Sequence, residues 1–462
     1  MKRVAIIGGG LSGVSAAYRL ARDAQVEFTL FESSSRLGGI VETHRQDGFV
    51  IECGPDSWVT EKPWARDLAI ELGLEAEIIP SNDDHRRTYL LQHGKLIPMP
   101  DGMRMMVPTD LSAIAASPLF SEEARLAYQR EPGRAVELKA SALKEGEDES
   151  VAGFVRRHFG DEVARTIAGP LLSGVFGGDV ETLSVRAVMP AFVKMEREHG
   201  SLINAVQSLA NRNTNSVFTS LRSGLATLIE RMAATLPPER TQLGHDVTSL
   251  TRKNNGWLIC TKNAEEFFDA VIIAAPAHIT RSLLRSVDER FDSLLAMDAT
   301  SAIVVALAFL PEQARSLSIP GGFGYLVPQT SAAPTHPQLL ACTFVNQKFP
   351  HRAPEGGVLL RGFFGGDTAS SLLHKSDDTL ITMAAQRLSE VLGPLPPPHI
   401  SIVRRWPLSL PQYAVGHLDR MAQLEALVNR FPGLHLIGNA YYGVGLPDMV
   451  RMGREAASRA AS

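Results

Sequence analysis

The spacing of hydrophobic and polar residues differs along the chain. At the N-terminus this spacing predicts a small supersecondary unit. Residues 4–7 form a short apolar run of the kind found in buried parallel strands. A glycine-rich turn follows, and residues 11–22 then show a helical period with Ala and Leu on the inner face. Residues 26–31 form a second apolar run. We therefore predict a strand, a helix and a second, parallel strand at the start of the chain.

Later patterns predict two further groups of elements. Residues 98–205 indicate helices interrupted by Pro and Gly. Strand-like runs then predict a second, largely antiparallel sheet, with members at 303–310, 324–327, 339–345 and 358–364. A buried run at 434–438 leads through a glycine-rich turn into a helical pattern over 449–460. This repeats the order of the N-terminus, so we expect both ends of the chain to share one domain into which the rest is inserted.

The first glycine-rich turn carries the clearest chemistry. Gly8, Gly10 and Gly13 have the spacing GxGxxG directly between the predicted strand and helix. In that position glycines allow a tight turn and close backbone approach, and the helix N-terminus binds a pyrophosphate. Glu32 ends the second run, 19 residues after Gly13, and its carboxylate suits an unmodified ribose 2′-hydroxyl. An isolated GxGxxG is weak evidence, but this context predicts dinucleotide binding.

Length, charge and cysteine content narrow the class of protein. A chain of 462 residues exceeds one ordinary hydrophobic core, so we expect two or three domains. The net charge of −4 gives no reason to expect a nucleic-acid partner. Cys53, Cys260 and Cys342 are widely spaced, which suggests reduced thiols and no structural metal. Because the first strand begins almost at Met1, and the apolar run at 302–310 is half a membrane span, we expect a cytoplasmic protein without a signal peptide.

Several motifs together resemble one protein family. Arg36, Gly38 and Gly39 match the stretch that follows the first supersecondary unit in amine-oxidase-like flavoproteins. The stretches SSSRLGG, GPDS, SGVFGGDVETLSVRAVMP, RWPLSLPQYAVGH and GNAYYGVGLPDMV resemble the oxygen-dependent porphyrinogen oxidases of haem synthesis, over almost the whole chain. There are two departures. Ser223-Gly224 stands where many relatives have two glycines, and the residues after Gly54 differ from the animal and fungal pattern.

The resemblance implies an α/β fold: an FAD-binding Rossmann-like domain, an inserted mixed-sheet substrate domain and a helical subdomain. The expected FAD-binding segments are 1–80, 206–285 and 416–462; the substrate segments are 81–97 and 286–415; the helical subdomain is 98–205. That subdomain carries an apolar patch, predicted as helical, for which burial in a core is the more frequent explanation and a membrane surface the alternative. The patch consists of Met103, Met105, Met106, Leu111, Ile114, Leu119 and Phe120.

The resemblance also implies which residues contact FAD. The glycine-rich turn would hold the pyrophosphate, and the acid at the end of the second strand the adenosine ribose. A valine would meet the adenine through its backbone, and the start of the last helix would offer N–H groups to the flavin carbonyl edge. These expected contacts are Gly8, Gly9, Gly10, Leu11, Ser12, Gly13, Glu32, Ser33, Gly38, Gly39, Ile40, Gly54, Pro55, Asp56, Ser57, Val247, Trp406, Val444, Gly445 and Leu446.

For the substrate, the family points to five residues. Arg87 could pair with a propionate, although a surface arginine beside Arg86 is the simpler explanation on pattern alone. Phe323, Leu326 and Phe363, with Gly324 among them, would hold a tetrapyrrole on its faces; ordinary core packing is the alternative.

The implied reaction is a six-electron oxidation of protoporphyrinogen IX to protoporphyrin IX. Hydride passes to the flavin, and dioxygen reoxidises it to give hydrogen peroxide. Coproporphyrinogen III is the alternative substrate, and no residue of the chain stands out as an obligatory base. A flavin amine oxidase, a pyridine-nucleotide dehydrogenase and a flavin-holding scaffold are the rival functions. Peripheral contact with the inner face of the membrane, a homodimer and hand-off to a ferrochelatase are further expectations from the resemblance.

Overall fold

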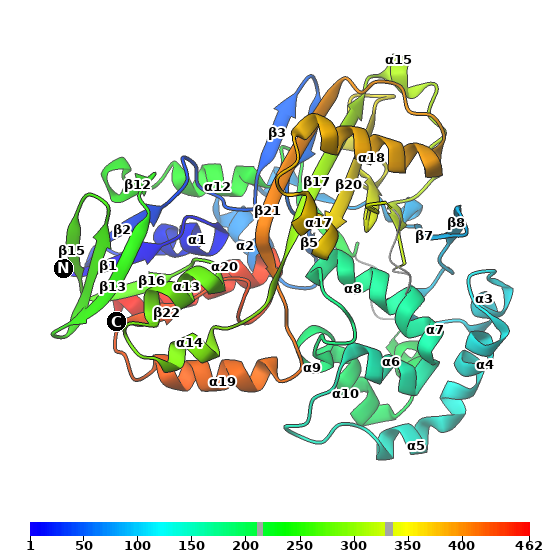
Figure 1. Cartoon of the computed structure of the whole chain (residues 1–462), viewed down its shortest axis with the longest axis horizontal. Coiled ribbons are helices and arrows are strands. Elements are labelled where there is room, and N and C mark those ends of the chain that lie inside the picture. The colour runs from blue at the N-terminus through cyan, green and yellow to red at the C-terminus, as the bar shows by residue number, and fades with distance from the viewer. Residues whose placement is uncertain (210–215, 329–335) are drawn as a thin grey trace.

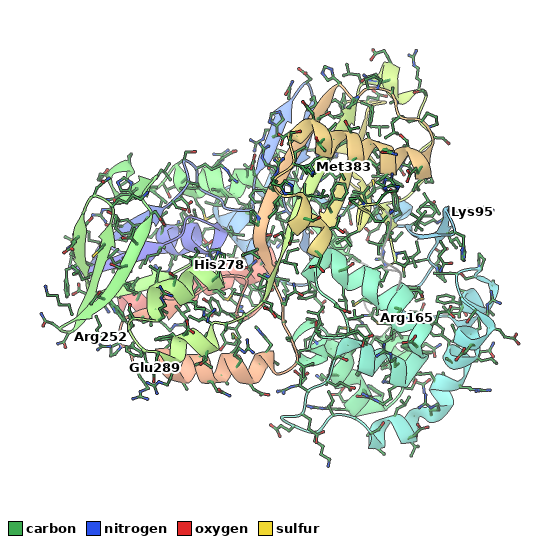
Figure 2. The ribbon with its side chains drawn as sticks, in the orientation of Figure 1. Lys95, Arg165, Arg252, His278, Glu289 and Met383 are labelled. Carbon is green, nitrogen blue, oxygen red and sulfur yellow. The ribbon has the colours of Figure 1, made fainter. Side chains whose placement is uncertain are left out.

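Three groups of elements make up the chain, as Figure 1 shows: a parallel sheet with its helices, a larger mixed sheet, and a set of helices. The computed structural model describes residues 1–209, 216–328 and 336–462. Figure 2 places Arg252 and Glu289 on the first group, Met383 beside the larger sheet and Arg165 among the helices. The six-segment domain division stays a prediction.

The parallel sheet is the centre of the first group. Its order is β12-β2-β1-β16-β22, and every pairing is parallel. The strands are β1 (Lys2–Ile7), β2 (Val26–Glu32), β12 (Thr241–Leu243), β16 (Ala270–Ile273) and β22 (Leu434–Leu436). The residues Val4 to Ile7 of β1 are buried between two neighbouring strands, which explains their continuous apolar run. The strands predicted at 4–7, 26–31 and 434–438 are confirmed within one or two residues at their ends.

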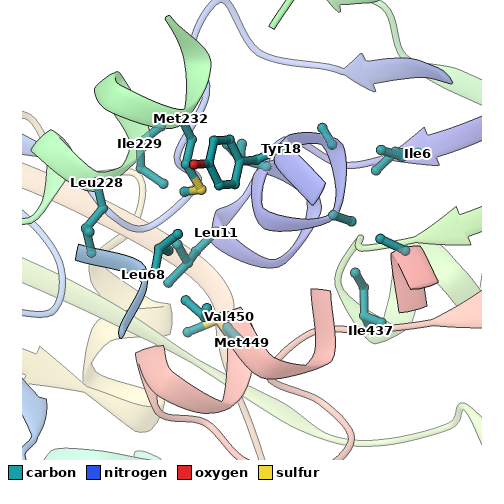
Figure 3. Close-up of a cluster of buried hydrophobic side chains, with 14 of the residues drawn as sticks. Ile6, Leu11, Tyr18, Leu68, Leu228, Ile229, Met232, Ile437, Met449 and Val450 are labelled. Atoms are coloured by element: carbon teal, nitrogen blue, oxygen red, sulfur yellow. The ribbon is translucent and has the colours of Figure 1, made fainter. Parts of the chain in front are cut away.

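Helices pack one face of this sheet. They are α1 (Leu11–Leu20), α2 (Trp64–Glu71), α12 (Ala226–Ala233) and α20 (Leu446–Ala461). Figure 3 shows Tyr18 of α1 beside Met232 of α12, and Leu11 of α1 near Leu68 of α2 and Val450 of α20. α1 and α20 approach closely because Gly453 has no side chain: a Cβ there would lie 2.4 Å from the Ser12 carbonyl oxygen. α20 also begins three residues earlier than the period predicted, because Gly445 caps it and Pro447 fits the first turn.

The opposite face is covered by a second core. It includes α13 (Ala277–Leu284), α14 (Arg290–Leu294), α19 (His417–Val428) and a three-stranded antiparallel sheet. The strands of that sheet are β13 (Val247–Lys253), β14 (Gly256–Thr261) and β15 (Glu265–Phe268). Shorter strands connect the groups, namely β3 (Thr43–Gln46), β4 (Phe49–Glu52), β5 (Trp58–Val59), β6 (Ile78–Pro80) and β11 (Phe218–Leu221).

The larger sheet has seven strands in the order β21-β17-β20-β19-β18-β7-β8. Their bounds are β7 (Thr88–Gln92), β8 (Lys95–Pro98), β17 (Ala299–Phe309), β18 (Gly324–Leu326), β19 (Ala341–Phe344), β20 (Val358–Gly365) and β21 (Ile400–Pro411). All pairings are antiparallel except that of β7 with β18. The prediction of a largely antiparallel second sheet is therefore confirmed.

One face of this sheet is sealed by two helices. α17 (Gly366–Leu372) and α18 (Asp377–Leu392) lie against the strands, as Figure 1 shows. Ile303, Val305, Tyr325 and Phe364 point into the core beneath them. Because side chains alternate along a strand, the neighbours of these residues point to the opposite face, called the site face below.

The helical group has its own core. Its helices are α3 (Leu111–Ala116), α4 (Glu122–Arg130), α5 (Ala135–Ala140), α6 (Val151–Phe159), α7 (Asp161–Val163), α8 (Gly169–Phe176), α9 (Val185–Val188), α10 (Pro190–His199) and α11 (Leu202–Leu209). The predicted apolar helix is wrong at its start: β9 (Met103–Arg104) and β10 (Val107–Pro108) form a hairpin with Met105 in the left-handed region at φ 54°.

The apolar patch is part of this core. Met106, Ile114, Leu119 and Phe120 are buried, and Met103, Met105 and Leu111 pack against the cluster. This agrees with the core explanation for the patch. Within the described residues, no helix is both long and apolar enough to cross a membrane.

Candidate active site

The GxGxxG turn is built by close backbone contacts. Gly8 has φ 106°, and its N–H donates to the Phe31 carbonyl at 2.8 Å. A Cβ on Gly13 would lie 1.9 Å from the Gly8 carbonyl oxygen, so only glycine lets α1 begin this near to β1. A Cβ on Gly10, in contrast, would meet no atom within 4 Å. The space in front of Gly10 is therefore open, at the N-terminus of α1.

The start of α1 fits a phosphate group. The first N–H groups of a helix have no partner within the helix, and Gly10 supplies no side-chain cap. The Ser12 hydroxyl is buried and makes no hydrogen bond to any described residue. A phosphate would supply acceptors for both kinds of donor. Leu11, in contrast, is buried in the core, so only its backbone can serve the predicted contact.

The carboxylate of Glu32 lies across the same turn. Its Oε2 accepts from the Gly9 N–H at 2.6 Å, and its Oε1 accepts from the Ser34 N–H at 2.7 Å. The backbone carbonyl of Glu32 accepts from the His245 N–H at 2.9 Å. This bond brings the segment leading into β13, which begins at Val247, next to Glu32 and the exposed Ser33. The predicted ribose and adenine residues therefore share one neighbourhood.

The loop over residues 36–42 closes against the glycine turn. The Gly38 N–H donates to the Gly9 carbonyl at 2.8 Å, and a Cβ on Gly39 would lie 3.2 Å from the Gly10 Cα. Arg36 holds the loop's shape, since its Nη2 donates to the Gly39 carbonyl at 2.6 Å and to the Glu42 carboxylate at 3.0 Å. The sequence motif contained Arg36, but its role as an internal brace was not predicted.

The N-terminus of α20 lies at the same edge of the parallel sheet. β1 and β22 are parallel, and each leads through a glycine turn into its helix. The connections also leave the central strand in opposite directions, to β2 on one side and to β16 and β22 on the other. Ligands of such sheets bind at this switch point, outside the carboxyl ends of the strands. The predicted residues Val444 and Gly445 are partly open there, whereas Leu446 is buried.

Two of the family-like motifs are bonded to one another. The Tyr413 hydroxyl donates to the Asn439 carbonyl at 2.7 Å and accepts from the Gly443 N–H at 2.9 Å. His417 stacks on Tyr413 with ring centroids 3.9 Å apart and pairs with the Tyr441 carbonyl at 2.9 Å. Burial lowers the pKa of His417, which favours a neutral ring. The PQYAVGH stretch therefore holds the glycine turn before α20.

Loop 54–57 lies between the two sheets. A Cβ on Gly54 would lie 1.9 Å from the Ile40 carbonyl oxygen, so the loop presses against the segment that contains Ile40. The Trp406 indole N–H donates to the Cys53 carbonyl at 2.7 Å, which places Trp406 at the start of the loop. The Asp56 carboxylate accepts from Ser57 at 2.7 Å. Pro55 and its neighbours are only partly buried.

The charge on Asp56 is held by two cations. Lys348, from α16 (Val345–Lys348), donates to Asp56 at 3.0 Å, and the Arg361 guanidinium lies 3.4 Å away. Burial alone would raise the pKa of Asp56, but these cations outweigh burial and hold the pKa well below its ordinary value. Sequence reasoning missed Lys348 and Arg361, because no local pattern marks residues that meet a loop some 300 positions away.

The site face of the seven-stranded sheet collects several predicted substrate residues. Leu326 pairs with Ala341, Ala341 with Phe363, and Phe363 with Val304, so these four residues form one row across β18, β19, β20 and β17. The next row contains Gly324, Thr343 and Arg361. Leu326 also packs against the helical group. The face is therefore an apolar platform between loop 54–57 and the helices.

Arg87 lies at the end of this platform. It precedes β7, its side chain is exposed, and its carbonyl accepts from the Phe323 N–H at 2.8 Å. The Arg87 guanidinium makes no ion pair or hydrogen bond within the described part of the chain. Arg87, Phe323 and Gly324 are thus brought together, and Phe363 lies two strands further along.

No metal centre accompanies these groups: across residues 1–209, 216–328 and 336–462, no three His, Cys, Asp or Glu side chains gather as ligands. All three cysteines, including the buried Cys53 and Cys342, are free thiols.

Comparison with known proteins decides the family. The sequence matches the profile described as flavin containing amine oxidoreductase over residues 11–461. The chain belongs to this family. It is therefore a flavoprotein oxidase, and FAD is its cofactor, in agreement with the sequence prediction.

This flavoprotein is similar to several named proteins over nearly its full length. It is 33% identical to coproporphyrinogen III oxidase of Bacillus subtilis, covering 99% of this chain and 98% of the relative. It is 29% identical to chloroplastic protoporphyrinogen oxidase 1 of Arabidopsis thaliana, covering 98% and 86%. A crystal structure from Exiguobacterium sp. 255-15, provisionally named protoporphyrinogen oxidase, superposes with a TM-score of 0.86 at 33% identity, covering 99% and 98%. The predicted resemblance and fold class are confirmed.

Proposed function

We propose that this flavoprotein is a porphyrinogen oxidase that uses dioxygen as its electron acceptor. The observation that carries the proposal is the apolar row of Leu326, Ala341, Phe363 and Val304 on the site face. Leu326 and Phe363 in this row are partly exposed and offer a tetrapyrrole macrocycle an apolar packing surface, whereas Ala341 and Val304 are buried beside them. Names of relatives at 27–33% identity over most of their length support the same substrate class.

FAD, when bound, supplies the two-electron oxidation that this chemistry requires. The chain itself supplies positioning. The N-termini of α1 and α20 and the turn beside Glu32 would hold the cofactor, and loop 54–57 would face the platform. Arg87, exposed at the platform's end, would pair with a propionate of the substrate.

Two porphyrinogens fit this class. On the family resemblance alone, protoporphyrinogen IX is the predicted substrate and coproporphyrinogen III the alternative. Relatives named coproporphyrinogen III oxidase are 30–33% identical, whereas the chloroplastic protoporphyrinogen oxidases are 27–29% identical. The Exiguobacterium structure that is provisionally named protoporphyrinogen oxidase is 33% identical. On this comparison we propose coproporphyrinogen III as the physiological substrate, with protoporphyrinogen IX as the second candidate. Peripheral membrane contact, a homodimer and hand-off to a ferrochelatase stay proposals that rest on the family resemblance alone.

An amine oxidase of the same fold is the more distant alternative. An aromatic cage for an amine would need side chains that face each other beside the C-terminal motif. Tyr441 is instead buried in the core beside the parallel sheet, and the Tyr442 hydroxyl bonds to Met421 and Glu425 of α19. These contacts differ from those of an aromatic cage, which favours a porphyrinogen over an amine as the substrate.

Aerobic turnover tests the proposal. Purified holoenzyme is incubated separately with coproporphyrinogen III, protoporphyrinogen IX and a panel of primary amines. We expect porphyrin fluorescence from the porphyrinogens, peroxide in threefold excess over porphyrin, and faster turnover of coproporphyrinogen III. Peroxide from amines without porphyrin formation would reject the proposal.

A further inference from the structure

A group of buried charges stands behind loop 54–57. The side chains of Asp56, Lys348 and Arg361 are 14%, 11% and 2% exposed. Lys348 donates to Asp56 at 3.0 Å and to the Ser57 hydroxyl at 3.1 Å. Two cations therefore share one carboxylate in a place where water has little access.

The surrounding groups do not cancel this excess of positive charge. Arg352 pairs with Glu52 at 3.0 Å, and both are almost completely buried, so that pair is balanced. Burial raises the pKa of the neighbouring Cys53 thiol to about 11, which keeps that thiol neutral. Glu42 forms ion pairs with both Arg36 and Arg404, so two cations again face one carboxylate.

Arg361 joins this charge to the loop and to the platform. It lies on β20 and points to the same face as Phe363, whose ring centroid is 4.9 Å from its guanidinium carbon. Its Nη2 donates to the Gly54 carbonyl, and its Nη1 faces Asp56. One guanidinium fork thus contacts two points of the loop that are two residues apart through two separate nitrogens, whereas a lysine would have to reach both with a single nitrogen. Its Nε is buried and has no partner among the described residues.

We propose that Arg361 is a positioning residue for the flavin: its fork fixes loop 54–57, and its uncompensated charge stabilises negative charge on the reduced cofactor. A buried cation acts strongly on a nearby anion because little water screens it. The inference deepens the proposed function and rests on its placement of the flavin beside this loop.

The test compares two substitutions that remove opposite charges. The midpoint potential of bound FAD is measured by chemical reduction against a reference dye, without any porphyrinogen. We expect Arg361→Gln to shift the potential to more negative values and Asp56→Asn to shift it to more positive values. If the cluster only holds the loop in shape, both variants will move the potential in one direction or leave it unchanged, and the proposal fails.

Arg361→Lys separates charge from geometry. It should keep a potential near that of the parent, while FAD affinity, measured by fluorescence titration of the apoprotein, falls about tenfold because one grip on the loop is lost. The proposal would also be overturned if Arg361→Gln kept both the FAD affinity and the FAD midpoint potential of the parent protein.

The helical group offers a matched control for loss of a buried charge. Glu131 there accepts from the Ser201 hydroxyl at 2.5 Å and pairs with His158 at 2.9 Å, all fully buried and outside the site. Glu131→Gln should lower thermal stability and leave the potential unchanged. If Arg361→Gln does not fold, Asp56→Asn decides alone, and an unchanged or more negative potential rejects the proposal. Porphyrin formation is scored separately, so failure of the proposed function gives a different result.

Discussion

The cofactor edge of the parallel sheet and the site face of the seven-stranded sheet recognise ligands by different means. The first offers backbone N–H groups at two helix N-termini and depends on positions where a side chain cannot fit, such as Gly13. The second offers side chains, with Phe363 and Leu326 as apolar surface and Arg361 as a buried charge. A backbone site should respond to substitution in an all-or-none way, whereas a side-chain site should respond in steps.

The largest effect is expected for Gly13→Val. A Cβ would lie 1.9 Å from the Gly8 carbonyl, which would force α1 away from β1. We predict folded protein almost free of flavin, or no folded protein, as measured by flavin absorbance and circular dichroism. Gly10→Ala is the control within the motif: its Cβ meets no protein atom within 4 Å, so it should fold normally and lose FAD affinity only. Normal flavin content and activity in Gly13→Val would show that the GxGxxG motif is not part of the FAD site.

Arg352 gives a prediction about the stability of the fold and not about ligand binding. It is fully buried against Glu52, which also accepts from the Leu225 N–H at 2.8 Å. Removing one partner of such a pair leaves a buried charge, so Arg352→Met should lower the free energy of unfolding by about 3–5 kcal/mol. In denaturant titrations the double variant Glu52→Gln/Arg352→Met should recover most of that loss. Additive losses would show that the two side chains are not coupled.

Arg87→Ala should act on the substrate side alone. A guanidinium–carboxylate pair contributes about one to two decades in affinity, so we predict a KM raised roughly tenfold, a less affected kcat and unchanged flavin content. Arg87→Lys should restore part of the effect, because it keeps the charge and loses the planar fork. The neighbouring exposed Arg86→Ala serves as the control in steady-state kinetics with both porphyrinogens. Parent-like KM values for Arg87→Ala would require another propionate partner.

The smallest effect is the pH dependence that Asp56 contributes. Because its pKa in the folded state is depressed, its stabilisation is complete above the ordinary carboxyl pKa and is lost as pH falls through the folded value. Flavin retention should therefore be insensitive to this group above about pH 4. Below that pH, Asp56→Asn should show a flatter acid profile than the parent. Equal profiles would mean that Asp56 does not stay ionised in the fold.

The same contrast explains what could be predicted from the sequence. The glycine turn and Glu32 were predicted because their geometry is local, within one strand–helix–strand unit. The contact of Tyr413 with the turn before α20 was not predicted, although both stretches resemble the family, because nothing in either stretch indicates that they meet. Arg361 and Lys348 had no signal, since their partners lie some 300 residues away in sequence and only the folded sheets bring them together.

Local pattern also failed where tertiary packing decides the conformation. The methionine-rich stretch from Met103 looked helical but forms a hairpin whose Met106 is buried in the helical core. Burial of that side chain and the left-handed Met105 fix the hairpin, and neither can be read from hydrophobic period.

Anaerobic mixing of the holoenzyme with coproporphyrinogen III, followed by admission of air, tests the central claim most directly. The flavin absorption band should bleach on mixing, at a rate fast enough for turnover, and return with air as porphyrin appears. Protoporphyrinogen IX should bleach the flavin more slowly. A flavin that stays oxidised with both porphyrinogens, yet is bleached by an amine or by dithionite, would contradict the assignment as a porphyrinogen oxidase.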